Sequence, residues 1–260
     1  MSNNRWTKDQ LKLAFHLYCQ IPFGKLHSRN HEIVELAQLI GRTPSAVAMK
    51  LVNFASIDPA ITATGRAGLG NASSLDREIW AEFNADWEGL VVQCNRLRVT
   101  IEEEKGIRRP TNFYLDETVD REDFTGETRQ VITEQRIKQH FFRRAVLSSY
   151  RGRCCMSGLS EPCLLLASHI VPWSKDKANR LNPSNGLCLS ALHDRAFDKG
   201  LITLAEDFTV IVSKQLLNND NDLMRFAIAE LHGRSIELPD RFFPSKEFIA
   251  RHRTEVFNSR

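Results

Sequence analysis

The hydrophobic pattern of this chain changes its period once, near Gln130. From residue 5 to about residue 100, apolar side chains recur at helical spacing. Beyond Gln130, one amphipathic helix is followed by short apolar runs with turn residues between them. Helices followed by short strands are typical of an α+β chain with separate domains. We predict a mostly helical domain over 1–100, a linker of mixed charge over 101–130 and a second domain over 131–260.

The first domain carries clear helix boundaries. Thr7 and Gln10 have the spacing of a capping box, in which each side chain bonds the backbone N–H of the other residue. A second helix should end at Gly41, since glycine readily adopts a left-handed conformation. Thr43 followed by Pro44 should open a third helix. Further along, the pattern predicts a loop over 62–74 and a helix over 75–90.

Two short helices joined by a turn containing glycine are the sequence form of a helix-turn-helix. The segment from Ala37 to Phe54, with Trp6 upstream, is similar to the Myb-like or winged-helix variety. If this module contacts DNA, the polar side chains able to reach it are Arg42, Thr43, Ser45 and Lys50. The same geometry also occurs in purely structural and protein-docking helices, so both interpretations remain open.

Composition excludes several classes of protein. The longest uninterrupted apolar run, Cys163–Ala167, is far shorter than the roughly 18 to 20 residues that cross a bilayer, so no membrane association is expected. The N-terminus is polar, and no secretory leader is predicted. Six cysteines in 260 residues do not form a disulfide framework, which favours a reducing compartment such as the cytoplasm. The net charge of +3 is too small to identify a partner.

The second domain has a distinctive order of elements. An amphipathic helix over 136–150 precedes a brief strand at Leu164–Ala167, which ends before Ser168-His169. A turn cluster at 182–186 leads into a second strand, 187–189, and Ser190 can cap a helix over 191–199. A hairpin over 201–212 follows, and a last helix starts near Pro244.

Three fragments of this region occur together in a known family. They are SHIVPW (168–173), NPSNGLCLS (182–190) and LHDRAFDKGLI (192–202). In this order, on these predicted elements, the chain resembles the HNH endonucleases of the prokaryotic restriction-type branch, which are built on a ββα-metal unit. The resemblance covers roughly residues 143–213 and more loosely the tail to Phe257. It implies a nuclease that acts on double-stranded DNA.

The chemistry explains why these residue types belong together. His169 corresponds to the family's first histidine, and an imidazole with an ordinary pKa near ~6.5 can deprotonate water at neutral pH. Asp194 and Asp198 lie nine and thirteen residues after Asn185, where the family commonly carries ligands. Their i, i+4 spacing places both carboxylates on one helix face, as a clamp for Mg²⁺ or Mn²⁺.

The fragments also depart from the family pattern. Many relatives carry Asp or His before the first histidine, whereas this chain has Ser168, a weaker neutral ligand. His193 matches the final histidine of the motif but lies off the face shared by Asp194 and Asp198. We keep it as a substitute ligand or phosphate contact. Asn185 is expected to bond backbone across the ββ loop and so to orient His169.

A basic stretch precedes the motif. Between Arg129 and Arg153 there are seven Lys or Arg residues and one acid, Glu134. A solvated helix face is one interpretation. With the nuclease resemblance, phosphate contacts by four arginines become the better one: Arg143, Arg144, Arg151 and Arg153. Structural Zn²⁺ is not expected, because Cys154, Cys155, Cys163 and Cys188 supply no two C-x2-C pairs.

The resemblance further implies restriction of, or defence against, foreign DNA, including modified DNA, although no residue identifies a modified base. Two alternatives stay open. One is a non-catalytic DNA-binding regulator with a decayed HNH fold, for which Ser168 would be the first sign of loss. The other is an RNA nuclease. A homodimer is compatible with cutting both strands, but the sequence carries no interface signal.

Overall fold

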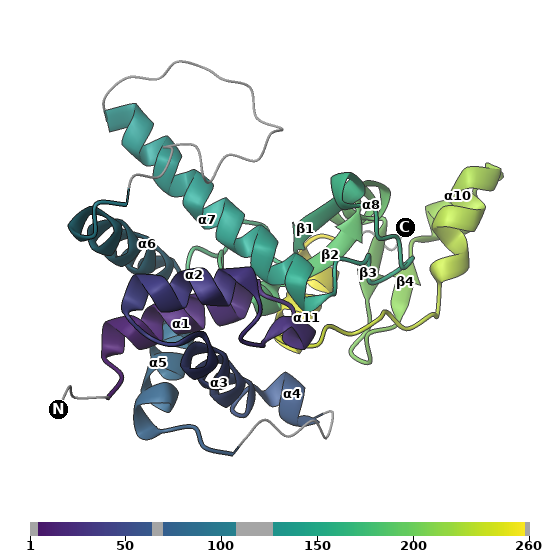
Figure 1. The fold of residues 1–260 in the computed structure, drawn as a ribbon. Helices are drawn as coiled ribbons and strands as arrows, with labels where there is room; N and C mark the ends of the chain where they lie inside the picture. Colours follow the sequence, from purple (N-terminus) through teal and green to yellow (C-terminus); the bar gives the residue numbers. More distant parts are fainter. Residues whose placement is uncertain (1–4, 64–69, 108–126, 258–260) are drawn as a thin grey trace. The chain divides into compact units, whose positions relative to one another are not determined.

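A computed structural model describes residues 5–63, 70–107 and 127–257, drawn in Figure 1. The chain divides into two compact units, Met1–Ala145 and Val146–Arg260. The division falls inside helix α7 (Glu127–Ser149), whereas the predicted linker over 101–130 lies mainly outside the described residues. Among those residues, no helix is long and apolar enough to span a membrane.

The N-terminal unit is helical. Its elements are α1 (Lys8–Gln20), α2 (His31–Ile40), α3 (Pro44–Ala55), α4 (Pro59–Ala63), α5 (Ser74–Ala85), α6 (Trp87–Glu104) and the larger part of α7. Phe15 lies at the centre of the core, with ring centroids 4.6 Å from Phe83 and 5.0 Å from Phe54. An aromatic core of this kind supplies a large apolar burial at few positions.

Three predicted helix boundaries in this unit are confirmed. Thr7 and Gln10 form the capping box that opens α1. Gly41 ends α2 with φ 68°, a backbone conformation that other residues adopt only with strain. Thr43 caps α3 before Pro44. The turn between α2 and α3 is therefore determined by local chemistry.

The helix predicted over 75–90 is in fact two helices. The backbone breaks at Asp86 (φ −149°, ψ 81°), whose carboxylate accepts a hydrogen bond from the Gly89 N–H and caps α6. The helical periodicity continues on both sides of this break because Phe83 and Trp87 are both buried in the same core. Periodicity alone could not reveal an internal cap of this kind.

Lys50 corrects a sequence prediction. The sequence predicts that Lys50 can reach DNA if the module binds it, but Lys50 is 9% exposed and its ammonium donates to both carboxylate oxygens of Asp76, each at 3.0 Å. Asp76 is fully buried and also caps α5. The side chain of Lys50 therefore joins α3 to α5 and is not available to a phosphate.

Removing one partner of this buried pair should destabilise the fold strongly. Asp76→Ala leaves the Lys50 ammonium buried and uncompensated, so we expect a loss of about 3 to 5 kcal/mol in the free energy of unfolding. Glu78→Ala is the matched control, because it breaks the exposed pair with Lys8 and should change the free energy of unfolding little. Urea unfolding measures both variants, and equal small losses would contradict the assignment.

The C-terminal unit carries two small antiparallel sheets. Strand β1 (Leu165–His169) pairs with β2 (Gly186–Ser190), and His169 lies opposite Gly186. Helix α8 (Ala191–Asp198) follows β2 directly, and β3 (Ile202–Leu204) pairs with β4 (Val210–Val212). The remaining helices are α9 (Lys214–Leu217), α10 (Asp222–Ala227) and α11 (Lys246–Glu255). The mixed α+β class is thereby confirmed, with a ββα unit at 165–198.

His252 anchors α11 to this ββα unit. Its ring stacks on Phe197 with centroids 3.7 Å apart, accepts from the Thr203 hydroxyl (2.8 Å) and donates to the Phe197 carbonyl (3.1 Å). Burial lowers the pKa of His252 to about 4, and the Phe197 carbonyl offsets this only in part. The folded protein therefore keeps this ring neutral where an unfolded chain would protonate it.

This pKa difference predicts acid sensitivity. As the pH falls below about 6.5, His252 becomes protonated in the unfolded chain but stays neutral in the folded one. The resulting loss in the free energy of unfolding reaches about 3 kcal/mol near pH 4. We expect the free energy of unfolding to fall less between pH 7.5 and pH 4 in His252→Gln than in the wild type. An identical fall in both proteins would show that His252 is not the group concerned.

Candidate active site

The ββα unit brings together the ends of β1 and α8. The connection is direct, because Ser190 ends β2 and its hydroxyl caps α8 by accepting from the His193 N–H at 3.3 Å. Helix α8 packs on β1, β2 and β3. Ser168 at the end of β1 and Asp194 in the first turn of α8 are thereby neighbours, although they are 26 residues apart in the sequence.

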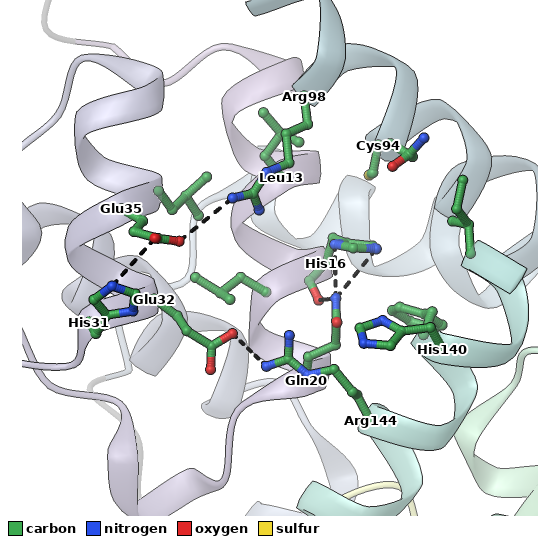
Figure 2. A pocket seen from close by; sticks show the side chains of 15 residues that line it. Leu13, His16, Gln20, His31, Glu32, Glu35, Cys94, Arg98, His140 and Arg144 are labelled. Atoms are coloured by element: carbon green, nitrogen blue, oxygen red, sulfur yellow. Dashed lines mark hydrogen bonds and ion pairs between the residues drawn. The ribbon is translucent and has the colours of Figure 1, made fainter. Parts of the chain in front are cut away.

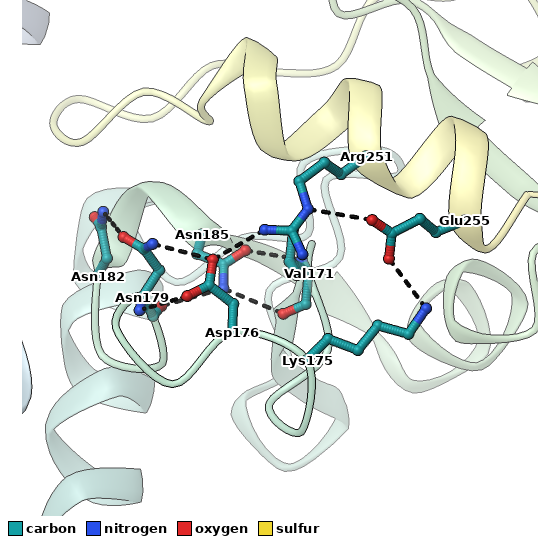
Figure 3. Close-up of polar contacts among 8 residues, drawn as sticks. All are labelled: Val171, Lys175, Asp176, Asn179, Asn182, Asn185, Arg251 and Glu255. Carbon is teal, nitrogen blue, oxygen red and sulfur yellow. Dashed lines mark hydrogen bonds and ion pairs between the residues drawn. The ribbon is translucent and has the colours of Figure 1, made fainter.

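Asn185 is completely buried and bonds the backbone of the loop between β1 and β2. Its Oδ1 accepts from the Val171 N–H at 2.8 Å, and its Nδ2 lies 3.2 Å from the carbonyls of both Val171 and Asn179 (Figure 3). Its own carbonyl accepts from the Ile170 N–H. These bonds hold the backbone that directly follows His169, as the predicted orienting role requires.

His169 is held as a neutral imidazole with a defined tautomer. Its Nε2 lies 2.9 Å from the Arg180 carbonyl, which only accepts hydrogen bonds, so Nε2 carries the hydrogen and Nδ1 the lone pair. Burial lowers the pKa of His169, and the bond to Arg180 offsets only part of this. The Trp173 ring meets the imidazole edge to face at 5.4 Å. A ring in this state can accept a proton at neutral pH.

Asp194 and Asp198 interact with each other on one face of α8. Burial raises the pKa of Asp194, against the opposing effects of the Ser168 hydroxyl and the Arg195 charge. Burial and the negative charge of Asp194 raise the pKa of Asp198. Two carboxylates that disfavour each other's ionisation are a favourable environment for a cation. The predicted spacing therefore produces the expected electrostatic pair.

The Ser168 hydroxyl supports the same interpretation. Ser168 is 2% exposed, and its Oγ makes no hydrogen bond of ordinary geometry within the described residues. It nevertheless lies near enough to Asp194 to lower the pKa of that carboxyl group. A buried polar atom without a full partner is costly unless something else satisfies it. An oxygen-coordinated divalent cation, or its bound water, fits here.

This fit is limited to the two carboxylates and one hydroxyl. Among the described residues, no group of three or more His, Cys, Asp or Glu side chains is arranged to hold a metal ion. Mg²⁺ and Mn²⁺ often keep several waters and take one or two carboxylates plus substrate oxygens, so the set fits these ions better than a metal that needs a full protein cage. The cysteines of this region are free thiols.

His193 does not share this site, which corrects its predicted role as a substitute ligand or phosphate contact. It is 3% exposed, and its Nε2 donates to the Ala227 carbonyl at 2.9 Å. Its Nδ1 lies 3.0 Å from the Ser190 hydroxyl and 3.3 Å from the Cys154 sulfur. Both ring nitrogens are thus used in bonds that anchor α8 to its surroundings.

The sequence did not reveal the partnership of His193 with Cys154. Burial works against a charged ring, but the bonds to Cys154 and Ala227 raise the pKa of His193. Burial likewise opposes a thiolate, yet hydrogen bonds led by that from His193 lower the pKa of Cys154 to about 6. Each group therefore favours the charged form of the other, which ties the segment before β1 to α8.

The predicted phosphate-binding arginines have different environments. Arg144 faces a cavity of about 230 Å³ in the N-terminal unit and pairs with Glu32 (Figure 2). Arg151 pairs with Glu237 and Asp240, and Arg143 is partly buried. Arg153 is exposed and has no acidic partner among the described residues. Of the four, Arg153 is best placed to meet a phosphate.

In the N-terminal module, Ser45 is exposed at the start of α3. Thr43 is exposed but its hydroxyl accepts from the Ala46 N–H as the cap of α3. Arg42 is bonded to the Arg5 carbonyl and the Gln10 side chain, and it lies over the Trp6 ring at 5.0 Å. Arg42 and Thr43 therefore have structural roles in this unit.

Two exposed cations beside the carboxylate pair escaped the sequence reasoning. Arg195 and Lys199 lie on α8 or directly after it, and both lower the pKa of Asp198. The fragment LHDRAFDKGLI already places each of them directly after an aspartate, which is the sequence signal for their position. At this position, Arg195 and Lys199 could contact the phosphates of a nucleic-acid strand bound beside the two aspartates.

Comparison with known proteins identifies one part of the chain. The family model described as HNH endonuclease matches residues 154–205. This match lies inside the predicted range of 143–213 and contains His169, Asn185, Asp194 and Asp198. No curated protein matches the chain.

Proposed function

We propose that this protein is a metal-dependent endonuclease that hydrolyses phosphodiester bonds in double-stranded DNA, since residues 154–205 match the HNH endonuclease family. One observation carries the proposal. His169, a neutral imidazole with its hydrogen on Nε2, directly follows Ser168, whose buried hydroxyl lies against Asp194. In β1, the proposed proton acceptor thus directly follows the residue whose hydroxyl lies beside the proposed carboxylate pair.

The roles of the residues follow from this arrangement. His169 takes a proton from the attacking water at Nδ1, while its Nε2–H remains bonded to the Arg180 carbonyl. Asn185 holds the loop backbone on both sides of the site and so keeps the imidazole in place. Arg195 and Lys199 attract the phosphates that flank the scissile bond.

Asp194 and Asp198, with Ser168 as a weak third oxygen, would hold Mg²⁺ or Mn²⁺. When bound, such an ion supplies electrostatic stabilisation of the charge that builds up on the phosphoryl and leaving oxygens. The protein's contribution is to orient the two carboxylates on α8 and to bury Asp194 in part. Because Ser168 replaces a stronger ligand, metal affinity should be low.

The N-terminal unit would select or position the DNA. Ser45, exposed at the start of α3, is the side chain of the predicted helix-turn-helix that remains best placed for contact. Restriction of foreign DNA, including modified DNA, is the biological role that fits such a nuclease. This role is supported by the family resemblance and by no individual residue.

Incubation of the purified protein with supercoiled plasmid tests the proposal. We expect nicking or linearisation with Mg²⁺ or Mn²⁺ and none with EDTA. Parallel reactions with duplex DNA and with RNA of the same sequence separate a DNA nuclease from an RNA nuclease. Cleavage that persists in EDTA, or cleavage of RNA alone, would overturn the proposed activity.

A non-catalytic DNA-binding regulator is the second candidate. Ser168 at the position of a ligand, and a protein ligand set of only two carboxylates, favour it. Such a protein would retard duplex DNA in a gel at any metal concentration and never cut it. Binding without nicking, over a range of Mg²⁺ and Mn²⁺ concentrations, would support this candidate against the enzyme.

A further inference from the structure

The loop between β1 and β2 contains a tight turn that is organised by Asp176. Its Oδ1 accepts from the backbone N–H of Asn179 at 3.2 Å, and its Oδ2 lies 3.1 Å from the Asn179 side-chain Nδ2. The same Oδ2 accepts from Nη1 of Arg251 at 3.0 Å (Figure 3). Arg251 belongs to α11 and lies 75 residues after Asp176, so this ion pair joins the turn to a helix that is distant in the sequence.

The end of this turn presents two successive carbonyls to the proposed catalytic residues. The Asn179 carbonyl lies 3.2 Å from Nδ2 of Asn185, and the Arg180 carbonyl lies 2.9 Å from Nε2 of His169. The turn thus contacts both the proposed base and the residue that orients it. A displacement of one peptide unit would disturb both bonds together.

Two further hydrogen bonds stabilise the turn. Arg180 donates from Nε to the Trp173 carbonyl at 2.7 Å, and Asn182 donates to the Asn179 side-chain oxygen at 3.1 Å. The Asp176 side chain is only 15% exposed. The neighbouring pair of Lys175 with Glu255 is about 40% exposed on both sides. Glu255 also accepts from Nε of Arg251 at 3.3 Å, but the Lys175 side chain makes no bond to Asn179 or Arg180 within the described residues.

We propose that the ion pair between Arg251 and Asp176 positions His169 for catalysis by holding the Arg180 carbonyl against its Nε2–H. The catalytic use of this arrangement rests on the proposed nuclease function, whereas the effect of the ion pair on the His169 ring does not. The carbonyl keeps the hydrogen on Nε2 and leaves the lone pair on Nδ1. Without it, the other tautomer becomes competitive and places a proton on the nitrogen that must accept one.

The tautomer of His169 gives a direct test that needs neither metal nor substrate. In protein with isotope-labelled histidine, at pH 8, the ring carbon and nitrogen shifts distinguish the two neutral tautomers. We expect the wild type and the control Lys175→Gln to show the Nε2–H form, and Asp176→Asn and Arg251→Gln to show a mixture. Wild-type shifts in both of these folded variants would overturn the proposal.

Cleavage kinetics provide the second readout. We expect Asp176→Asn and Arg251→Gln to lower kcat by roughly 10- to 100-fold with little change in KM for DNA, as for other residues that orient catalytic groups. Arg251→Lys should recover part of the loss, and the double variant should be no worse than either single one, because the two residues act as one unit. Additive losses, or an equal loss in Lys175→Gln, would contradict the inference.

Thermal unfolding separates positioning from stability. The ion pair is partly exposed, so we expect the Tm values of Arg251→Gln and Lys175→Gln to be similar. A loss of activity that follows the Tm would indicate a structural role only and would overturn the proposal. If the wild type cuts no nucleic acid, the nuclease function fails, while the tautomer measurement still decides whether this pair holds His169.

Discussion

Replacing His169 with alanine is expected to lower the rate of plasmid cleavage by roughly 10²- to 10⁴-fold, the usual contribution of a general base. The imidazole is partly buried, and its Nε2 is bonded to the Arg180 carbonyl, so the substitution removes the nitrogen Nδ1 that we propose as the proton acceptor. The rate of nicking at saturating Mg²⁺ measures the effect. Binding of duplex DNA, measured by fluorescence anisotropy in EDTA, should remain within about twofold, because His169 contributes no net charge at neutral pH.

His232→Ala is the matched control for this variant. His232 lies in the same unit, and its side chain is exposed. Its loss should leave the cleavage rate unchanged. Full activity in His169→Ala would refute the assignment of the base, and a parallel loss of DNA binding would move His169 from catalysis to substrate binding.

The second large effect is expected at the carboxylate pair. Asp194→Ala and Asp198→Ala should each lower cleavage by roughly 10²-fold or more at limiting Mg²⁺, since each removes one of the two charged oxygens offered to a cation. Ser168→Ala should cost less, because a neutral hydroxyl contributes little to binding a hard cation. The Mg²⁺ dependence of the rate distinguishes a loss of metal affinity from a loss of turnover.

Asp220→Ala, at an exposed position in the same unit, controls for the removal of negative charge. It should leave the Mg²⁺ dependence unaltered. Thermal unfolding provides a separate check. Because Asp194 and Asp198 each raise the cost of ionising the site, their removal should not lower the Tm in the absence of metal. If Ser168→Ala proves more damaging than Asp198→Ala, the cation is held nearer β1 than we propose.

The sequence predicted those features of the fold that depend on neighbouring residues. The capping box of Thr7 and Gln10, the left-handed Gly41 and the cap at Thr43 all involve groups within four positions of each other. The strand–loop–strand–helix order was predicted because turn residues and short apolar runs mark each boundary locally. The observed strands differ from the predicted ones by one or two residues at their ends.

The same reasoning failed where a distant partner decides the role of a side chain. The position of Lys50 on α3 suggests a side chain available to DNA, but Asp76, 26 residues further along the chain, forms a buried ion pair with it. The motif suggests His193 as a substitute ligand or phosphate contact, but its ring is bonded to Cys154 and to the Ala227 carbonyl. Nothing in the spacing of either residue indicates these partners.

The candidate site divides in the same way. The sequence by itself determined that Asp194 and Asp198 share a helix face, because the 3.6-residue period of a helix requires it, and that Ser168 and His169 close a strand. Only the tertiary structure decided which nitrogen of His169 bears the hydrogen and which oxygen meets Asp194. Those choices depend on a carbonyl at position 180 and on the packing of α8 against β1, contacts that form only when distant parts of the chain fold together.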